Sequence, residues 1–226
     1  MKNLSKSIYY LISSILQKKH LYLIKSMQFV NRAKLIDLRR MDYIRMSTLE
    51  LCANEILSNN VSGNTAELGV YRGDFAKEIN SVFPDRKLYL FDTFEGFDSR
   101  DVKLEIENSY SSGSQDFSGT SVGLVLSKMP FPDNCIVRKG FFPDTAEGIN
   151  DTFCFVSIDA DLYKPIIDGL KYFYPKLSKG GYIFVHDYNN DGYSGVKRAV
   201  DEFCRKENIS FVPIADVAGT VVISKG

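Results

Sequence analysis

Acidic side chains follow four separate apolar runs of the chain, and they are the residues best suited to chemistry. They are Glu67, Asp92, Asp159 and the adjacent pair His186 and Asp187. Because parallel strands deliver their carboxyl ends to one edge of a sheet, we expect these side chains to converge there. Each acid taken singly could cap a helix or close a turn, but the repetition at successive strand ends favours a common site. Carboxylates gathered at one place repel each other unless a cation or a proton relieves them.

Three residues of this set have the chemistry of a divalent-metal site. Asp159 and Asp187 offer carboxylate oxygens, and His186 offers an imidazole nitrogen. Both ligand types bind divalent ions in proteins. The sequence therefore predicts that these three residues can bind a metal ion at the edge of the sheet.

Residues 65–73 read Thr-Ala-Glu-Leu-Gly-Val-Tyr-Arg-Gly, a short apolar strand that ends in a glycine-bracketed turn. Glycine lets the backbone approach a ligand closely and adopt positive φ angles. The dinucleotide-binding fingerprint would be Gly-x-Gly-x-x-Gly, whereas Gly69 and Gly73 are spaced as Gly-x-x-x-Gly. This difference favours a ligand without a pyrophosphate, whose hydroxyl or amine groups Glu67 can bind. Asp92 ends the next strand, where nucleotide-binding α/β folds place an acid for ribose hydroxyls.

Strand-like and helix-like segments alternate along the chain and would position these side chains. Strands are expected at residues 65–70, 87–92, 134–139, 153–158 and 182–185, helices at 42–60, 74–83, 163–174 and 194–206, and a hairpin at 209–214 and 220–224. Five alternations followed by a hairpin predict an α/β fold with a doubly wound, mostly parallel seven-stranded sheet. Ser47 or Thr48 is expected to cap the helix at residues 42–60.

Residues 98–132 show the least regular pattern of the chain. They are charged at first and then rich in serine and glycine. Long loops within compact domains are usually functional or disordered, so this segment is predicted either to cover the site as a lid or to lack order. A short helix is expected within it at residues 122–129.

Residues 1–42 are expected to form a basic, amphipathic helical extension to a domain at residues 43–226. Asp37 is the only acidic residue among residues 1–40, and apolar residues recur there at helical spacing. We favour packing of this apolar stripe on the domain or on a second subunit, which predicts a homo-oligomer. Contact with a membrane surface is the second alternative. A signal peptide is the third, but Lys18 and Lys19 interrupt the apolar run and no small-residue cleavage site follows.

The overall composition gives no electrostatic preference for nucleic acid. The 226 residues include 28 Lys and Arg residues and 28 Asp and Glu residues, so no global field attracts a polyanion. The four cysteines, Cys52, Cys135, Cys154 and Cys204, lie far apart in apolar segments and match no zinc or disulfide spacing. We expect reduced, buried thiols and therefore a cytoplasmic protein.

Five short motifs occur in one order along the chain, at residues 67–73, 91–96, 140–145, 157–163 and 180–187. They read Glu-Leu-Gly-Val-Tyr-Arg-Gly, Phe-Asp-Thr-Phe-Glu-Gly, Gly-Phe-Phe-Pro-Asp-Thr, Ser-Ile-Asp-Ala-Asp-Leu-Tyr and Gly-Gly-Tyr-Ile-Phe-Val-His-Asp. As an ordered set, over about residues 43–224, they resemble the macrocin O-methyltransferase family. The resemblance implies a class I, Rossmann-like fold that binds S-adenosylmethionine. It also implies methylation of a hydroxyl of a sugar or glycoside in natural-product or surface-glycan biosynthesis.

The same resemblance implies a set of cofactor-binding residues. Arg45, Met46 and Ser47 are similar to the Thr-Met segment that folds over the cofactor in the family. Residues 67–73 would line the methionine part, Asp92 the ribose, and residues 140–141 the adenine. The cofactor-binding residues implied are Met46, Ser47, Glu67, Leu68, Gly69, Tyr71, Gly73, Asp92, Thr93, Gly140, Phe141 and Asp159.

The resemblance also implies a role for the acids at the last two strand ends. In the family, a first Asp and a later Asp pair hold magnesium and orient a sugar diol, and the first Asp is the proposed general base. Asp159 matches the first Asp of the family, and Asp187 matches the second Asp of the later pair. Two positions depart from the family pattern: His186 stands where the family usually has Asp, and Phe141 stands where it usually has Trp. Magnesium prefers oxygen ligands, so the histidine favours manganese or iron over magnesium as the divalent metal. The alternative is that no metal binds and His186 is the general base. The catalytic residues implied are Asp159, His186 and Asp187.

Two other functions stay open from the sequence. One is a nucleotide-dependent oxidoreductase, which the absence of Gly-x-Gly-x-x-Gly disfavours. The other is a non-catalytic, methyltransferase-like scaffold held at a membrane by its basic N-terminus. The presence of Glu67, Asp92, Asp159 and Asp187 together favours the enzyme over the scaffold.

Overall fold

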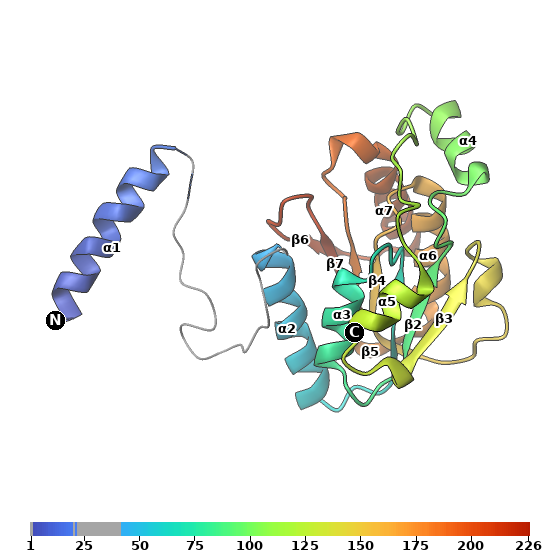
Figure 1. The fold of residues 1–226 in the computed structure, drawn as a ribbon, viewed down its shortest axis with the longest axis horizontal. Helices are drawn as coiled ribbons and strands as arrows, with labels where there is room; N and C mark the ends of the chain where they lie inside the picture. The colour runs from blue at the N-terminus through green and yellow to red at the C-terminus, as the bar shows by residue number, and fades with distance from the viewer. Residues whose placement is uncertain (1, 20, 22–41) are drawn as a thin grey trace. The chain divides into compact units, whose positions relative to one another are not determined.

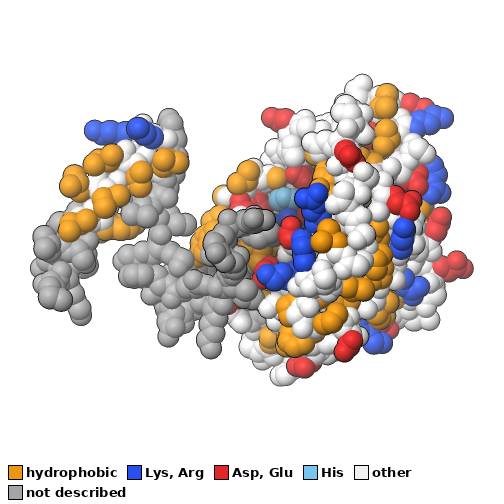
Figure 2. Space-filling view, viewed as in Figure 1, with side chains coloured by type: hydrophobic (Ala, Val, Ile, Leu, Met, Phe, Trp, Pro, Cys, Tyr) orange, Lys and Arg blue, Asp and Glu red, His pale blue; other side chains and the backbone are white. Residues whose placement is uncertain are grey.

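The computed structural model describes residues 2–19, 21 and 42–226 (Figure 1). The chain forms two compact units, residues 1–35 and residues 36–226. The first contains α1 (Lys2–Gln17), the helix that the basic N-terminal segment predicts. Apolar side chains gather along α1 (Figure 2), yet none of the described helices is long and apolar enough to cross a membrane. The rest of the predicted helical extension, residues 22–41, lies outside the described residues.

The second unit is built on a seven-stranded sheet with the order β3-β2-β1-β4-β5-β7-β6 (Figure 1). The strands are β1 (Asn64–Leu68), β2 (Leu88–Asp92), β3 (Cys135–Lys139), β4 (Phe153–Ile158), β5 (Leu177–Val185), β6 (Phe211–Pro213) and β7 (Val221–Ser224). The first five are parallel, and β7 runs antiparallel between β5 and β6. The predicted mostly parallel sheet and C-terminal hairpin are confirmed. The strand order reverses between β1 and β4, which is where open α/β sheets form a ligand crevice.

Helices cover both faces of the sheet (Figure 1). One layer contains α2 (Tyr43–Ser58), α3 (Asp74–Val82) and α5 (Val122–Lys128), and the other contains α4 (Ser99–Glu107), α6 (Tyr163–Lys176) and α7 (Ser194–Glu207). Phe155 packs against Phe83, at the C-terminal end of α3, with the ring centres 6.0 Å apart. Phe153 instead contacts Phe173 of α6 at 5.2 Å. Residues two apart on a strand normally share a face, and a register shift between Phe153 and Phe155 explains the difference.

The N-terminus of α2 differs from the prediction that Ser47 or Thr48 caps this helix. Asp42 is the cap, because its Oδ1 accepts from the backbone N–H groups of Ile44 and Arg45 at 2.7 and 3.3 Å. The hydroxyls of Ser47 and Thr48 donate to the carbonyl of Ile44 within the helix. The second oxygen of Asp42 accepts from the N–H of Val217, at 2.8 Å, so the start of α2 is fixed to the β6–β7 connection.

The segment 98–132 contains α4 as well as the predicted short helix, which is confirmed as α5. The connection between them, residues 108–121, is held by side-chain hydrogen bonds. The hydroxyl of Tyr193 donates to Gln115, the hydroxyl of Thr120 to the carbonyl of Tyr71, and Ser111 to Glu105. This segment therefore lies along the loops that follow the strands, and it contributes to the cavity described next.

Candidate active site

The loops after β1, β2, β3 and β4 enclose a cavity of about 280 Å³ at the carboxyl edge of the sheet. It is lined by nine of the residues that the sequence predicts for a cofactor: Glu67, Leu68, Gly69, Tyr71, Asp92, Thr93, Gly140, Phe141 and Asp159. These residues come from four separate parts of the chain. The parallel strands bring them together at their carboxyl ends, which is where open α/β sheets bind ligands.

Glu67 is a buried acid at the floor of this cavity, and its side chain lacks one hydrogen-bond partner. It is 1% exposed, and its Oε2 has no partner among the described residues. Burial and the nearby carboxylates of Asp159 and Asp92 raise the pKa of Glu67 well above its usual value, while Arg45 opposes the shift. A cationic hydrogen-bond donor bound in the cavity would stabilise the charged form of Glu67.

Asp92 organises the turn that follows β1. Its Oδ2 accepts from the N–H groups of Val70 and Tyr71 at 2.7 and 2.8 Å, and its Oδ1 accepts from that of Phe94 at 2.6 Å. Tyr71 and Phe94 have positive φ angles of 47° and 55°, which few non-glycine residues adopt. Oδ2 uses both of its lone pairs in this turn, whereas Oδ1 keeps one, so Asp92 can hold the turn and still accept from one ligand hydroxyl through Oδ1.

Gly69 allows the turn after β1 to approach the end of β4. Its φ is +84°, and a Cβ built there would lie 2.1 Å from the carbonyl oxygen of Asp159. No residue with a side chain fits this contact without a shift of the backbone. The glycine therefore sets the distance between Glu67 on one strand and Asp159 on the next.

Aromatic rings, those of Tyr71, Phe97, Phe117 and Phe141, also line the cavity. The ring of Phe117, from the 108–121 connection, lies 5.1 Å from that of Tyr71 and 5.0 Å from that of Phe97. The guanidinium of Arg100 lies 3.5 Å from the centre of the Phe141 ring. These faces suit a flat, aromatic ligand group.

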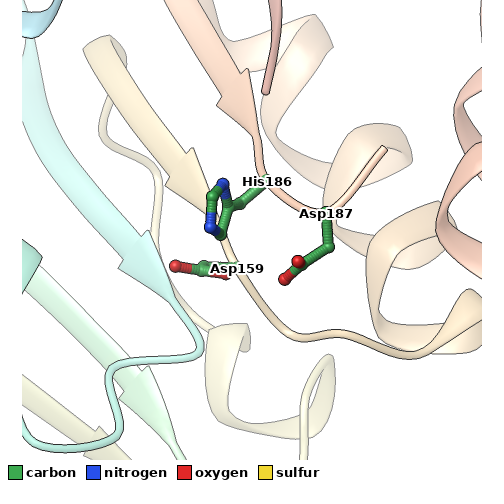
Figure 3. A group of neighbouring side chains, drawn as sticks. All are labelled: Asp159, His186 and Asp187. Atoms are coloured by element: carbon green, nitrogen blue, oxygen red, sulfur yellow. The ribbon is translucent and has the colours of Figure 1, made fainter. Parts of the chain in front are cut away.

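Asp159, His186 and Asp187 form a cluster beside this cavity, at the ends of the neighbouring strands β4 and β5. Their potential ligand atoms all lie within 4.8 Å of one another. Figure 3 shows the imidazole of His186 next to the carboxylate of Asp159, with the carboxylate of Asp187 pointing toward them from the other side. The three residues predicted for a metal site are therefore brought together, and Asp159 belongs to both the cluster and the cavity.

The orientation of His186 is fixed by a chain of hydrogen bonds from the β6–β7 hairpin. Its Nδ1 lies 2.9 Å from the hydroxyl oxygen of Thr220, which lies 2.5 Å from Oδ2 of Asp216. The hydroxyl has one proton, and the buried carboxylate of Asp216 can only accept it, so the hydroxyl oxygen accepts from Nδ1–H. The neutral imidazole therefore carries its lone pair on Nε2, the nitrogen that Figure 3 shows turned toward Asp159.

Asp161 is a site residue that our reading of the sequence did not select. It lines the cavity, and burial together with the charges of Asp159 and Asp187 raises its pKa well above the usual value. Asp161 and Asp187 both have φ angles of 60°, an unfavourable conformation that commonly marks functional sites. Asp161 could have been selected from the sequence, because Asp159-Ala160-Asp161 places a second acid directly after an apolar strand.

Arg45 belongs to the segment that the sequence compares with the family's Thr-Met segment, but it was not itself predicted as a site residue. Its Nη2 donates to Oδ2 of Asp159 at 3.0 Å, and its guanidinium lies 3.9 Å from the centre of the Phe75 ring. The neighbours that were selected, Met46 and Ser47, do not line the cavity, because Met46 is buried in the core and Ser47 bonds within α2. Gly73 does not line the cavity either, because it faces the side chains of Val125 and Met129.

The site thus combines three kinds of environment: aromatic rings, the buried pair Arg45 and Glu67, and the cluster of Asp159, His186 and Asp187. The cluster presents carboxylate oxygens and a basic nitrogen, which can take a proton or hold a cation.

Comparisons with known proteins point to one family. Its sequence model, Macrocin-O-methyltransferase (TylF), matches residues 18–225. The chain is 28% identical over 190 residues to the 8-demethyl-8-(2,3-dimethoxy-alpha-L-rhamnosyl)-tetracenomycin-C 4'-O-methyltransferase of Streptomyces olivaceus, covering 79% of this chain and 71% of the relative. It is also 28% identical over 198 residues to the demethyldecarbamoylnovobiocin O-methyltransferase of Streptomyces niveus, covering 80% and 71%.

A solved structure shows the same architecture. The O-methyltransferase NovP is similar with a TM-score of 0.66 and 26% sequence identity, covering 81% of this chain and 80% of that one. The predicted class I methyltransferase fold is thereby confirmed.

Proposed function

We propose that this chain, which belongs to the macrocin-O-methyltransferase family and is an O-methyltransferase, transfers a methyl group from S-adenosylmethionine to a sugar or glycoside hydroxyl. The observation that carries the proposal is the position of Asp159, which lines the cavity and also belongs to the cluster with His186 and Asp187. A methyl donor in the cavity and a hydroxyl at the cluster would meet there. The sugar class is supported by the tetracenomycin relative, whose name specifies a rhamnosyl-bearing acceptor.

The residues of the cavity fit S-adenosylmethionine. The unpartnered Oε2 of Glu67 suits its ammonium group, the remaining lone pair on Oδ1 of Asp92 suits a ribose hydroxyl, and the rings around Phe117 suit adenine. When bound, S-adenosylmethionine supplies a methyl group on a positively charged sulfur, which an acceptor oxygen can take by in-line displacement. The protein's part is to hold the donor and acceptor in line.

The cluster would bind the acceptor and receive the proton that its hydroxyl loses. In the neutral tautomer that donates from Nδ1 to Thr220, Nε2 of His186 is free to accept a proton, and the Asp159 carboxylate lies beside the imidazole. Both are suitable proton acceptors at this position. Asp161 and Asp187 lie next to them and can accept hydrogen bonds from a second hydroxyl of a diol.

The donor types of the cluster also fit a divalent metal ion. Two carboxylates and one imidazole suit manganese or iron better than magnesium. The N–H of His186 is directed to Thr220, as is usual for metal-bound histidine. A metal held by Asp159, His186 and Asp187 would lower the pKa of a bound hydroxyl, and His186 would then be a ligand and not the base.

Titration calorimetry of the full chain with S-adenosylmethionine and S-adenosylhomocysteine tests the cofactor. Transfer of a labelled methyl group to a nucleotide-linked rhamnose, assayed with and without manganese, tests the acceptor class. We expect both adenosyl compounds to bind and the label to reach the sugar. A protein that binds NAD but neither adenosyl compound would contradict the proposal and restore the oxidoreductase alternative.

A further inference from the structure

The helix α1 presents a face of large aliphatic side chains that the described residues leave exposed. Ile8, Leu11, Ile12 and Ile15 are 50, 64, 45 and 56% exposed. Their spacing along the sequence places all four on one side of the helix. Single exposed aliphatic residues are common on soluble proteins, whereas a contiguous apolar patch indicates a binding surface.

The charges of the N-terminal segment lie at the ends of α1 and not along it. Lys6 and Lys18 enclose residues 7–17, which contain no charged residue. The side of the helix opposite the aliphatic face carries Ser13 and Gln17, whose side chains bond to each other at 3.3 Å. A helix that packs on a protein usually has charged residues on its solvent side. In α1 that side is polar but uncharged, and the lysines flank it.

All the charges of this segment have one sign. Lys18 and Lys19 are exposed directly after α1, and Figure 2 shows basic side chains at one end of the apolar row. Residues 1–36 contain no Asp or Glu, and their basic residues are Lys2, Lys6, Lys18, Lys19, Lys25, Arg32 and Lys34. The surface that complements this segment is therefore apolar and anionic.

A phospholipid membrane and a second copy of this chain are the two surfaces to consider. All 28 Asp and Glu residues belong to residues 37–226, so a second copy is also acidic. Ion pairs with an acidic protein surface would require basic side chains along the helix. An uncharged amphipathic helix with lysines at its ends instead suits a bilayer surface, where apolar side chains enter the acyl region and lysines reach the headgroups.

We infer that α1 lies in the surface of an anionic phospholipid membrane, with its aliphatic face toward the acyl chains. The helix has 16 residues, fewer than the roughly 20 that a membrane-spanning helix needs, so it lies on the membrane and does not cross it. The family model begins at residue 18, so α1 is outside the part of the chain that matches the methyltransferases. The inference therefore does not rest on the proposed function.

Sedimentation of the full chain with lipid vesicles tests this inference. Vesicles of phosphatidylcholine with phosphatidylglycerol are compared with vesicles of phosphatidylcholine alone, at low and at high salt. We expect about tenfold tighter binding to the anionic vesicles, and less of this preference at high salt, because exposed basic residues are attracted to anionic lipid. The double variants Leu11→Ser with Ile15→Ser, and Lys18→Glu with Lys19→Glu, should each bind the anionic vesicles about tenfold more weakly.

Two further double variants, in the methyltransferase domain, are the matched controls. Ile106→Ser with Leu124→Ser changes aliphatic residues that are 59 and 39% exposed, and Lys171→Glu with Lys206→Glu changes exposed lysines. Both should bind vesicles as the wild type does. If the wild type binds anionic vesicles no better than neutral ones, or if either α1 variant binds as tightly as the wild type, the inference is overturned. The first of these results is independent of any variant's folding.

Sedimentation velocity without lipid identifies the alternative partner. An oligomer that the aliphatic variant of α1 dissociates, together with no vesicle binding by the wild type, would overturn the inference and assign this face of α1 to a second copy of the chain.

Discussion

Nδ1 of His186 lies 2.9 Å from the hydroxyl oxygen of Thr220, so a residue of the C-terminal hairpin determines which imidazole nitrogen faces the cluster. Thr220 is fully buried, and its hydroxyl donates a hydrogen bond to the carboxylate of Asp216. Valine has nearly the same shape as threonine but cannot accept from Nδ1–H. We expect Thr220→Val to reduce the rate of methyl transfer about 10–100-fold, the usual cost of losing such an orienting partner.

The affinity for S-adenosylhomocysteine should not change in this variant, because Thr220 does not line the cavity. Nitrogen NMR of the imidazole should show loss of the single tautomer, which a purely structural role would not affect. Thr220→Ser restores the hydroxyl and should recover most of the rate. Full activity of Thr220→Val would show that this hydrogen bond does not orient His186.

A second prediction concerns the close approach of β1 and β4. In Gly69→Ala the new methyl group would meet the carbonyl of Asp159 at 2.1 Å, at a residue with positive φ. We expect a loss of about 2–4 kcal/mol in the free energy of unfolding and weaker binding of S-adenosylhomocysteine. Denaturant unfolding and calorimetry measure the two effects.

Gly123→Ala is the matched control for this substitution. Gly123 lies in the short helix α5, and a Cβ there meets nothing within 4 Å. Alanine should stabilise the protein by about 0.5–1 kcal/mol, because glycine is the poorer helix former. Equal stability losses in both variants would contradict the proposed role of the close contact.

Most of the sheet could be predicted from the sequence, because its strands are apolar runs bounded by turn residues. The helices α3, α6 and α7 begin at the predicted residues, since each has an apolar face. α4 was not predicted, because its buried residues are the acids Asp101 and Glu105 and not an apolar stripe. The sequence of α4 therefore looks like that of a charged loop.

Site residues that directly follow an apolar strand could be predicted from the sequence. Site residues that reach the cluster only through contacts between segments far apart in the sequence could not. Glu67, Asp92 and Asp159 follow apolar strands and could be found by that rule. Arg45 lies within a helix, where a charged residue normally faces solvent. Thr220 belongs to an edge hairpin, and only the pairing of β7 with β5 brings it to His186.

A third prediction concerns the pH dependence of stability. Burial, with a smaller contribution from Asp98, raises the pKa of Asp101 to about 7. Folded protein therefore keeps a proton on Asp101 between about pH 4 and pH 7, where the unfolded chain has lost it. The contribution of Asp101 to the free energy of unfolding therefore falls as pH rises through this range.

Asp101→Asn removes this titration, so its melting temperature should fall less than that of wild type between pH 4.5 and pH 7.5. Scanning calorimetry at several pH values measures the difference. The same substitution at the exposed residue Asp85 serves as the control. Parallel curves for wild type and Asp101→Asn would show that Asp101 is ionised throughout.

The last prediction separates the two ways in which the cluster could remove the proton. If Asp159, His186 and Asp187 hold a metal, chelation should abolish turnover but spare binding of S-adenosylhomocysteine, and manganese should restore the rate. Asp159→Asn and Asp187→Asn should then behave like chelated enzyme, because an amide is a weaker ligand than a carboxylate. If His186 is instead a metal-free base, chelator should have no effect on the rate.

His186→Asp distinguishes these mechanisms in one variant. With a metal, a third carboxylate should improve the use of magnesium, because this ion prefers oxygen ligands. Without a metal, the variant loses the basic nitrogen that Thr220 holds in place, and its rate should collapse at every metal concentration. Rates measured in chelator, magnesium and manganese decide between the two results. Full activity in chelator, together with an active His186→Ala, would exclude both mechanisms and leave the positioning of donor and acceptor as the source of catalysis.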